Sequence, residues 1–180
     1  MGELTVLLGG ARSGKSSLAL RLARASGRPV TFIATAEARD GEMAERIARH
    51  RSERPADWSL REEPLELASA LASTPGDALA IIDCLSLWAS NLLERGSSDA
   101  EIDAAAITVV ERARDRSGPT IVVSNEIGLG IVPLGELTRR YRDVLGRLNS
   151  SFCDHADRAA LVVAGRALRL DRSEDLWISP

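Results

Sequence analysis

Short apolar segments alternate with longer amphipathic segments along most of the chain. The apolar segments are rich in β-branched and small residues and predict strands, at positions 4–8, 30–35, 78–83, 119–124 and 159–164. A weaker strand is predicted at 58–62, and a short extended tail after Gly165. The segments between the strands predict helices, at positions 16–25, 41–51, 65–71, 85–93, 101–114 and 136–156. Strands that alternate with helices are typical of α/β proteins whose parallel sheet is covered on both faces.

Length, charge and composition narrow the class of protein further. The 180 residues contain no linker, repeat or low-complexity segment, so we predict a single domain over residues 1–180. The net charge of −3 leaves no broad basic surface, so nucleic acid is not an expected partner. No apolar run reaches the roughly 18 residues of a membrane span, and Cys84 and Cys153 lack metal-ligand spacing. We therefore expect a cytoplasmic protein with free thiols and no membrane span.

A glycine-rich turn between the first predicted strand and helix matches the phosphate-binding pattern G-x-x-x-x-G-K-[ST]. The matching residues are Gly9, Gly10, Ala11, Arg12, Ser13, Gly14, Lys15 and Ser16. Glycines let a loop backbone approach a phosphate closely, and the following helix adds the positive end of its dipole. Lys15, the only lysine in the chain, is expected to bridge the β- and γ-phosphates of a nucleotide. A strand–turn–helix with chance glycines is the alternative, but the complete match in the expected context leaves it little support.

Two side chains are candidates for binding the Mg²⁺ that accompanies a nucleotide. Ser16 occupies the hydroxyl position that ligates Mg²⁺ in this pattern, and Asp83 ends a buried strand. An acid at the end of an apolar strand is common, so Asp83 is a candidate mainly because the phosphate loop is present. Asn125 and Glu126 follow the next strand, at the carboxyl edge where α/β sheets bind ligands. The chain cannot form the Asn-Lys-x-Asp element with which switch GTPases read guanine, because its one lysine is in the phosphate loop.

His50 lies in a basic segment, among Arg46, Arg49, Arg51 and Arg54. Clustered guanidinium groups suit polyphosphate binding and favour a neutral imidazole, which can attack phosphorus and form a phosphoramidate. A solvated basic helix face with a bystander histidine is the plainer interpretation, and the spacing alone favours it.

Four segments together resemble the bifunctional adenosylcobinamide kinase / adenosylcobinamide-phosphate guanylyltransferase family of cobalamin biosynthesis. In chain order they read GGARSGKS, RIARHRSERPADW, IIDCLSLWASNLL and SNEIGLGIVP. The phosphate loop alone is generic, whereas the His-x-x-x-Arg-Pro-x-x-Trp pattern and the last segment are far more specific to this family. The resemblance runs from Leu4 to about Leu170 and implies a P-loop NTPase fold of the RecA-like type.

The resemblance implies a two-step reaction on a corrinoid substrate. The hydroxyl of the aminopropanol arm of adenosylcobinamide is phosphorylated with ATP or GTP. GMP from GTP is then carried on a histidine to adenosylcobinamide phosphate, which gives adenosylcobinamide-GDP and pyrophosphate. The family is usually a homotrimer, so the same assembly is expected of this chain.

Carried onto this sequence, the resemblance makes His50 the guanylylated nucleophile, which acts beside the phosphate-binding Lys15. It adds contacts to the nucleotide outside the phosphate loop, at Ala34, Thr35, Ala36, Arg51, Ser52, Glu53, Arg54, Glu62 and Asp83. Because the phosphate loop serves the kinase step and His50 serves the transfer, we expect the His50 segment to move over one shared nucleotide site.

Two other functions remain open at this point. A simple P-loop small-molecule kinase would need Lys15, Ser16 and Asp83 but would not need His50. A nucleotide-binding regulatory module would bind GTP tightly without corrinoid-dependent turnover. The missing guanine-reading element and the lack of an appended effector domain disfavour that second alternative.

Overall fold

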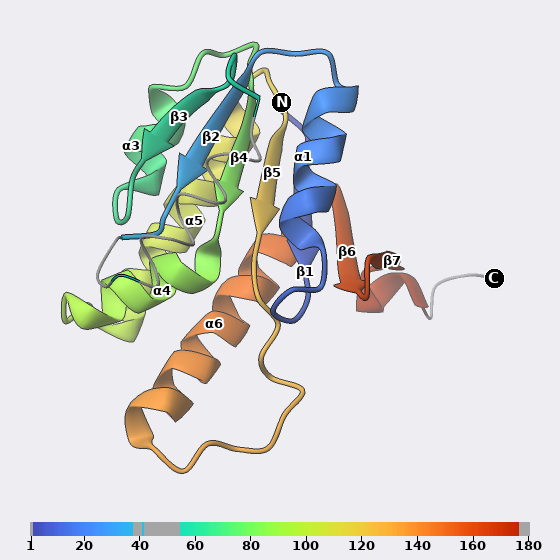
Figure 1. Cartoon of the computed structure of the whole chain (residues 1–180). Helices are drawn as coiled ribbons and strands as arrows, with labels where there is room; N and C mark the ends of the chain where they lie inside the picture. The colour runs from blue at the N-terminus through green and yellow to red at the C-terminus, as the bar shows by residue number, and fades with distance from the viewer. Residues whose placement is uncertain (1, 38–40, 42–54, 177–180) are drawn as a thin grey trace.

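Seven strands form one mixed sheet in the computed structural model, which describes residues 2–37, 41 and 55–176 (Figure 1). Across the sheet the strands follow the order β3-β2-β4-β5-β1-β6-β7. Their bounds are β1 Leu4–Leu8, β2 Val30–Ala34, β3 Ser59–Glu62, β4 Leu79–Asp83, β5 Thr120–Val123, β6 Arg158–Val163 and β7 Arg166–Leu170. The first six strands are parallel to one another, and β7 runs antiparallel to β6. The predicted α/β class with a mostly parallel sheet is therefore confirmed.

Helices pack against both faces of this sheet. The described helices are α1 Lys15–Ala25, α3 Leu67–Ala72, α4 Leu85–Glu94, α5 Asp99–Asp115 and α6 Glu136–Asp154, followed by the 3₁₀ helix η1 Ser173–Leu176. α1 packs over β1, β4 and β5 on one face, and α3 to α6 cover the opposite face (Figure 1). The helix predicted at 41–51 lies outside the described residues, apart from Gly41. None of the helices in the described part of the chain is long and apolar enough to cross a membrane.

The strands divide their side chains between two buried layers, as the pleat of a strand requires. On β1, Val6 packs in the layer beneath α3 to α6, while its neighbour Leu7 packs beneath α1. On β4, Ile82 packs in the layer beneath α3 to α6, and Ile81 packs beneath α1. Because both layers are apolar, these strands form continuous hydrophobic runs in the sequence rather than alternating patterns.

The segment after Gly165 is a strand that pairs with β6, whereas the sequence predicted only an extended tail. Ala164 and Gly165 have φ angles of 49° and 75°, and they join Val163 to its direct partner Arg166. Two consecutive positive φ angles are what a two-residue hairpin turn needs to match the twist of its strands. The pairing was missed because alanine, rather than the usual asparagine or aspartate, precedes the glycine of the turn.

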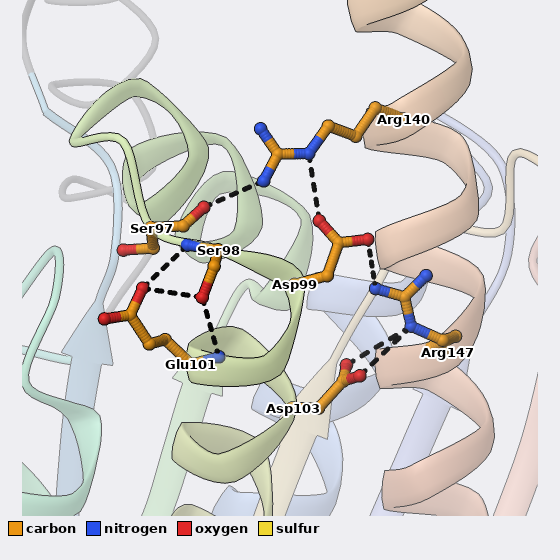
Figure 2. A network of polar contacts seen from close by, with 7 residues as sticks. All are labelled: Ser97, Ser98, Asp99, Glu101, Asp103, Arg140 and Arg147. Atoms are coloured by element: carbon orange, nitrogen blue, oxygen red, sulfur yellow. Dashed lines mark hydrogen bonds and ion pairs between the residues drawn. The ribbon is translucent and has the colours of Figure 1, made fainter.

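α5 begins two residues earlier than predicted because side chains cap its first turn (Figure 2). The Ser98 hydroxyl accepts the N–H of Glu101 at 3.3 Å, and the Glu101 carboxylate accepts the N–H of Ser98 at 2.8 Å. This reciprocal pair of hydrogen bonds satisfies two backbone donors that a helix start leaves without partners. The capping box therefore places the start of the helix at Asp99.

Ion pairs join α5 to α6 along their partly exposed edges (Figure 2). The Asp99 carboxylate accepts a hydrogen bond from Arg140 at 2.9 Å and another from Arg147 at 2.8 Å. Arg147 also donates to Asp103 at 3.2 Å. The hydrogen bonds from Arg140 and Arg147 hold the pKa of Asp99 below its ordinary value of 3.8.

Replacing Asp99 with Asn should remove a stabilisation that depends on pH. Because the pKa of Asp99 is lower in the folded protein, this stabilisation is fully present above its unfolded pKa of about 4. It is lost as the pH falls through the folded pKa. The difference in free energy of unfolding between wild type and Asp99→Asn, measured with urea, should stay constant from about pH 7 to about pH 5 and shrink below about pH 4. A difference that does not change with pH would contradict this account.

Phe152→Ala should destabilise the fold by about 3–5 kcal/mol, because the large-to-small change leaves a cavity in the core. Phe152 is fully buried on α6, in the layer that also contains Trp88. Leu168→Ala is a suitable control, since Leu168 on the edge strand β7 is 64% exposed and its truncation should change the free energy of unfolding by no more than about 0.5 kcal/mol. Urea unfolding of both variants tests the prediction, and equal effects would show that the packing is described wrongly.

Candidate active site

The phosphate loop connects the carboxyl end of β1 to the first turn of α1, as the sequence predicts. Gly9 and Gly14 have φ angles of 149° and 103°, a region that L side chains rarely adopt. A Cβ atom on Gly9 would lie 2.2 Å from the carbonyl oxygen of Val162 on the neighbouring strand β6. The loop therefore needs glycine at position 9 for two reasons, which are its backbone conformation and its close packing against β6.

Lys15 is the first residue of α1, and its side chain is buried within the phosphate loop. Its ammonium group donates a hydrogen bond to the carbonyl oxygen of Gly10 at 2.6 Å and another to the Ser13 hydroxyl at 3.4 Å. Only 6% of the residue is exposed, and a buried charge is costly unless hydrogen bonds compensate for its lost hydration. The contacts hold the ammonium group across the loop, in a position from which it can bind a phosphate oxygen.

Neighbouring strands hold the phosphate loop through two backbone hydrogen bonds. The N–H of Glu126, three residues beyond β5, donates to the carbonyl of Gly9 at 3.1 Å. The N–H of Gly165, in the turn between β6 and β7, donates to the carbonyl of Ser13 at 2.8 Å. The loop is therefore tied to both strands that flank β1.

The structure brings Ser16 and Asp83 to the same edge of the sheet. Ser16 is half-buried in the first turn of α1, and the half-buried Asp83 is the last residue of β4. β5 lies between β4 and β1, and Asp83, Val123 and Leu7 form one row across these three strands. Two strand spacings, or about 10 Å, therefore separate the backbone of Asp83 from that of β1.

Ala34, Thr35 and Ala36 lie at the carboxyl end of β2. Thr35 is fully buried, and its hydroxyl donates to the carbonyl of Cys84 and accepts the N–H of the same residue, both at 2.8 Å. The Thr35 N–H donates to the Asp83 carbonyl, and its own carbonyl accepts from the buried amide of Asn91 at 2.9 Å. Thr35 thus joins the ends of β2 and β4, while Ala36, beside it, is partly exposed.

Glu62 does not lie beside the phosphate loop. It ends the edge strand β3 and pairs with Ala34 in the sheet register. Three strands stand between β3 and β1, so about 19 Å separates their backbones. The structure therefore groups Glu62 with the end of β2, whereas Lys15 and Ser16 form a second group on α1.

The remaining predicted residues fall outside the part of the chain that the structure describes. They are His50, Arg51, Ser52, Glu53 and Arg54. Their roles stay predictions that rest on the resemblance.

Sequence reasoning missed a buried polar network at the carboxyl edge, centred on Asn149 of α6. Asn149 is 5% exposed, and its carbonyl oxygen accepts from the Ser124 hydroxyl at 2.6 Å. Its amide group donates to the carbonyl of Asn125 at 2.9 Å. Asn149 follows Leu145 by four residues and precedes Phe152 by three, so it occupies a position where the helix pattern otherwise has an apolar residue. A polar residue on the apolar face of this helix was the feature of the sequence that could have indicated a buried polar contact.

Both cysteines are free thiols, as expected. Cys84 directly follows Asp83, and its sulfur lies 2.8 Å from the Ser86 hydroxyl. Burial raises the pKa of Cys84 to about 11, and burial likewise raises the pKa of Cys153 to about 11. Both thiols are therefore protonated near neutral pH, which makes them poor nucleophiles.

None of the described residues forms a cluster of three or more His, Cys, Asp or Glu side chains that could hold a metal ion. A metal that arrives with a nucleotide needs no such cluster, because phosphate oxygens and water supply most of its ligands. The Ser16 hydroxyl and the Asp83 carboxylate are oxygen donors of the kind that Mg²⁺ prefers, and they fit this kind of site.

Comparisons with known proteins agree with this geometry. The family model described as "Cobinamide kinase / cobinamide phosphate guanyltransferase" matches residues 5–170. The "Bifunctional adenosylcobalamin biosynthesis protein CobP" of Pseudomonas aeruginosa is 48% identical, over 92% of this chain and 95% of its own length. The "Bifunctional adenosylcobalamin biosynthesis protein CobU" of Salmonella typhimurium is 33% identical, over 93% of this chain and 99% of its own.

A comparison with solved structures identifies the fold. The crystal structure of the RadB recombinase has a TM-score of 0.51 and 20% sequence identity, and the match covers 89% of this chain and 74% of that chain. At this identity the likeness concerns the fold alone. It agrees with the predicted P-loop NTPase architecture of the RecA-like type.

Gly9→Ala should destabilise the fold by at least about 1–3 kcal/mol, the usual effect of overpacking a close contact. The added methyl group would meet the Val162 carbonyl, and alanine would also be strained at this positive φ angle. Gly10→Ala is the matched control, because a Cβ atom at Gly10 meets nothing within 4 Å. Free energies of unfolding from urea titrations should separate the two variants, and a Gly9→Ala protein as stable as Gly10→Ala would contradict the description of the loop.

Proposed function

The chain belongs to the cobinamide kinase / cobinamide phosphate guanyltransferase family, and we propose that it carries out both reactions of that name. It phosphorylates adenosylcobinamide with ATP or GTP, then transfers GMP from GTP to adenosylcobinamide phosphate. The products of the second reaction are adenosylcobinamide-GDP and pyrophosphate. The observation that carries the proposal is the complete phosphate loop with the buried Lys15, set in a chain that matches the family over residues 5–170.

In the kinase reaction, the phosphate loop grips the β- and γ-phosphates of the nucleotide. The loop N–H groups and the N-terminal end of α1 face the phosphate oxygens, which favours negative charge at this position. Lys15, held by Gly10 and Ser13, bridges the β- and γ-phosphates and stabilises the charge that develops on the transferred group.

Ser16 and Asp83 are the residues that would hold Mg²⁺. The Ser16 hydroxyl would ligate it, and the Asp83 carboxylate, two strands away from β1, would hold it through water. When bound, the ion would supply positive charge beside the β- and γ-phosphates.

In the transfer reaction, His50 is the nucleophile. Its imidazole nitrogen forms a bond to the α-phosphorus of GTP, while the bond to the bridging oxygen breaks and pyrophosphate leaves. A phosphate oxygen of adenosylcobinamide phosphate then attacks the same phosphorus and releases His50. Two displacements in sequence predict retention of configuration at the α-phosphorus.

The other nucleotide contacts surround these two centres. The backbone of Ala34 and Ala36, positioned by the buried Thr35, and the exposed Glu62 form one group at the ends of β2 and β3. The segment from Arg51 to Arg54 belongs to the same proposal through the resemblance.

A location in the cytoplasm is also part of the proposed function, because free thiols suit a reducing compartment.

A homotrimeric assembly completes the proposal. Several large apolar side chains are more than half exposed in the segment that follows β5, and subunit contacts would cover such a surface. They are Leu129, Ile131, Val132, Leu134 and Leu137.

The covalent step is tested by labelling the protein with GTP that carries ³²P at either the α- or the γ-position. Wild type should take up label from the α-position only, and the label should be lost in acid and survive base, as a phosphoramidate does. His50→Ala should take up no label while its thermal unfolding stays unchanged. His155→Ala is the matched control, since His155 is exposed at the end of α6 and should label like wild type.

The labelling result separates the possible functions. Wild type that takes up no α-label in the presence of Mg²⁺ would overturn the guanylyltransferase reaction and leave a P-loop kinase. Tight GTP binding without any corrinoid-dependent turnover would instead indicate a regulatory module.

A further inference from the structure

Phosphoryl transfer to an alcohol is assisted by a carboxylate that orients the hydroxyl and accepts its proton. The phosphate loop, Lys15, Ser16 and Asp83 do not supply this group, because Asp83 is assigned to Mg²⁺. The Asn125-Glu126 pair, which follows β5, has no role in the proposed function so far.

The strand order decides which carboxylates can lie near the phosphate loop. Five acids end or follow strands at the carboxyl edge of the described sheet: Glu37 after β2, Glu62 on β3, Glu63 directly after β3, Asp83 on β4 and Glu126 after β5. β5 is adjacent to β1, whereas β2 and β3 lie three and four strand positions away, or about 14 and 19 Å. On the other side of β1, β6 ends in Val163 and is followed by Ala164 and Gly165 in the turn, none of which is an acid.

Glu126 is also bonded directly to the phosphate loop. Its N–H donates to the carbonyl of Gly9 at 3.1 Å, so its backbone lies beside the first residue of the loop. The residue is half-buried. Among the backbone hydrogen bonds between loops in the described part of the chain, Glu126 is the one of these five acids that bonds to the phosphate loop.

Hydrogen bonds orient the Glu126 carboxylate and leave it room for a further donor. Its Oε1 atom accepts the N–H of Gly128 at 2.5 Å, and its Oε2 atom lies 3.5 Å from the amide nitrogen of Asn149. Asn149 is itself buried and held by Ser124 and Asn125, so the orienting group is rigid. An ionised carboxylate has about four acceptor positions, so two contacts leave it able to accept a substrate hydroxyl.

We propose that Glu126 is the catalytic base of the kinase step, an inference that rests on the proposed function. The oxygen of the aminopropanol hydroxyl forms a bond to the γ-phosphorus, and Glu126 accepts the proton of that hydroxyl. The bond between the γ-phosphorus and the β,γ-bridging oxygen breaks, and ADP or GDP leaves. The guanylyl transfer through His50 does not use Glu126, because its attacking groups are an imidazole and a phosphate oxygen that carry no proton to remove.

The test compares the two half-reactions in Glu126→Gln, which keeps the shape of the side chain and an acceptor for the Gly128 N–H. Phosphorylation of adenosylcobinamide is followed with ATP labelled with ³²P at the γ-position, and guanylylation of the protein with GTP labelled at the α-position. The kcat of phosphorylation should fall about 10²- to 10⁴-fold, the usual contribution of a general base, with little change in the KM for ATP. The amount of covalent α-label should equal that of wild type. Glu136→Gln makes the same charge change at an exposed position in the first turn of α6 and should leave both readouts unchanged.

Each other outcome has a definite meaning. Glu126→Gln that phosphorylates adenosylcobinamide within about threefold of the wild-type rate would overturn the assignment, because general bases contribute far more. Loss of phosphorylation together with loss of α-label would also overturn it, and would assign Glu126 to the structure of the phosphate loop. Wild type that cannot phosphorylate adenosylcobinamide would overturn the proposed kinase activity itself, and this inference with it.

Discussion

The phosphate loop keeps its shape because the strands on either side of β1 donate hydrogen bonds to its carbonyl groups. Glu126, beyond β5, bonds to Gly9, and Gly165, beyond β6, bonds to Ser13. These hydrogen bonds fix the loop in a conformation in which the ammonium group of Lys15 donates to the carbonyl of Gly10. The arrangement depends on a parallel sheet, since only parallel strands bring all their carboxyl ends to one edge. The anion-binding site thus follows from the topology as much as from the motif.

The same topology distributes the chemistry along this edge of the sheet. The phosphate loop lies between β1 and α1. Glu126, which follows β5, is the next group along this edge, and Asp83 at the end of β4 lies one strand further away. The ends of β2 and β3, with Ala34 and Glu62, lie at the far side. The phosphate loop and the ends of β2 and β3 therefore lie on the same edge of the sheet, about 14–19 Å apart.

The fold was largely predictable from sequence because most strands are buried on both sides and form unmistakable apolar runs. The phosphate loop was equally predictable, since its residue types follow from the geometry of phosphate binding. Other features depended on partners distant in the chain. The pairing of β7 needed a hairpin turn at Ala164 with no strong turn signal, and the role of Asn149 depends on Ser124 and Asn125, which are brought to it only by folding. The distance between Glu62 and the phosphate loop could not be predicted either, because it depends on the order of the strands in the sheet, which local sequence patterns do not determine.

The two edge strands of the sheet have a further consequence, which concerns association rather than catalysis. An edge strand presents unpaired backbone groups that can recruit a strand from another molecule. β3 has only four residues and carries Arg61 and Glu62, while β7 has five and carries Arg166 and Arg169. Short, charged edges of this kind are unfavourable templates for strand addition. The sheet is thus protected against edge-to-edge aggregation, although its central strands are among the most hydrophobic segments of the chain.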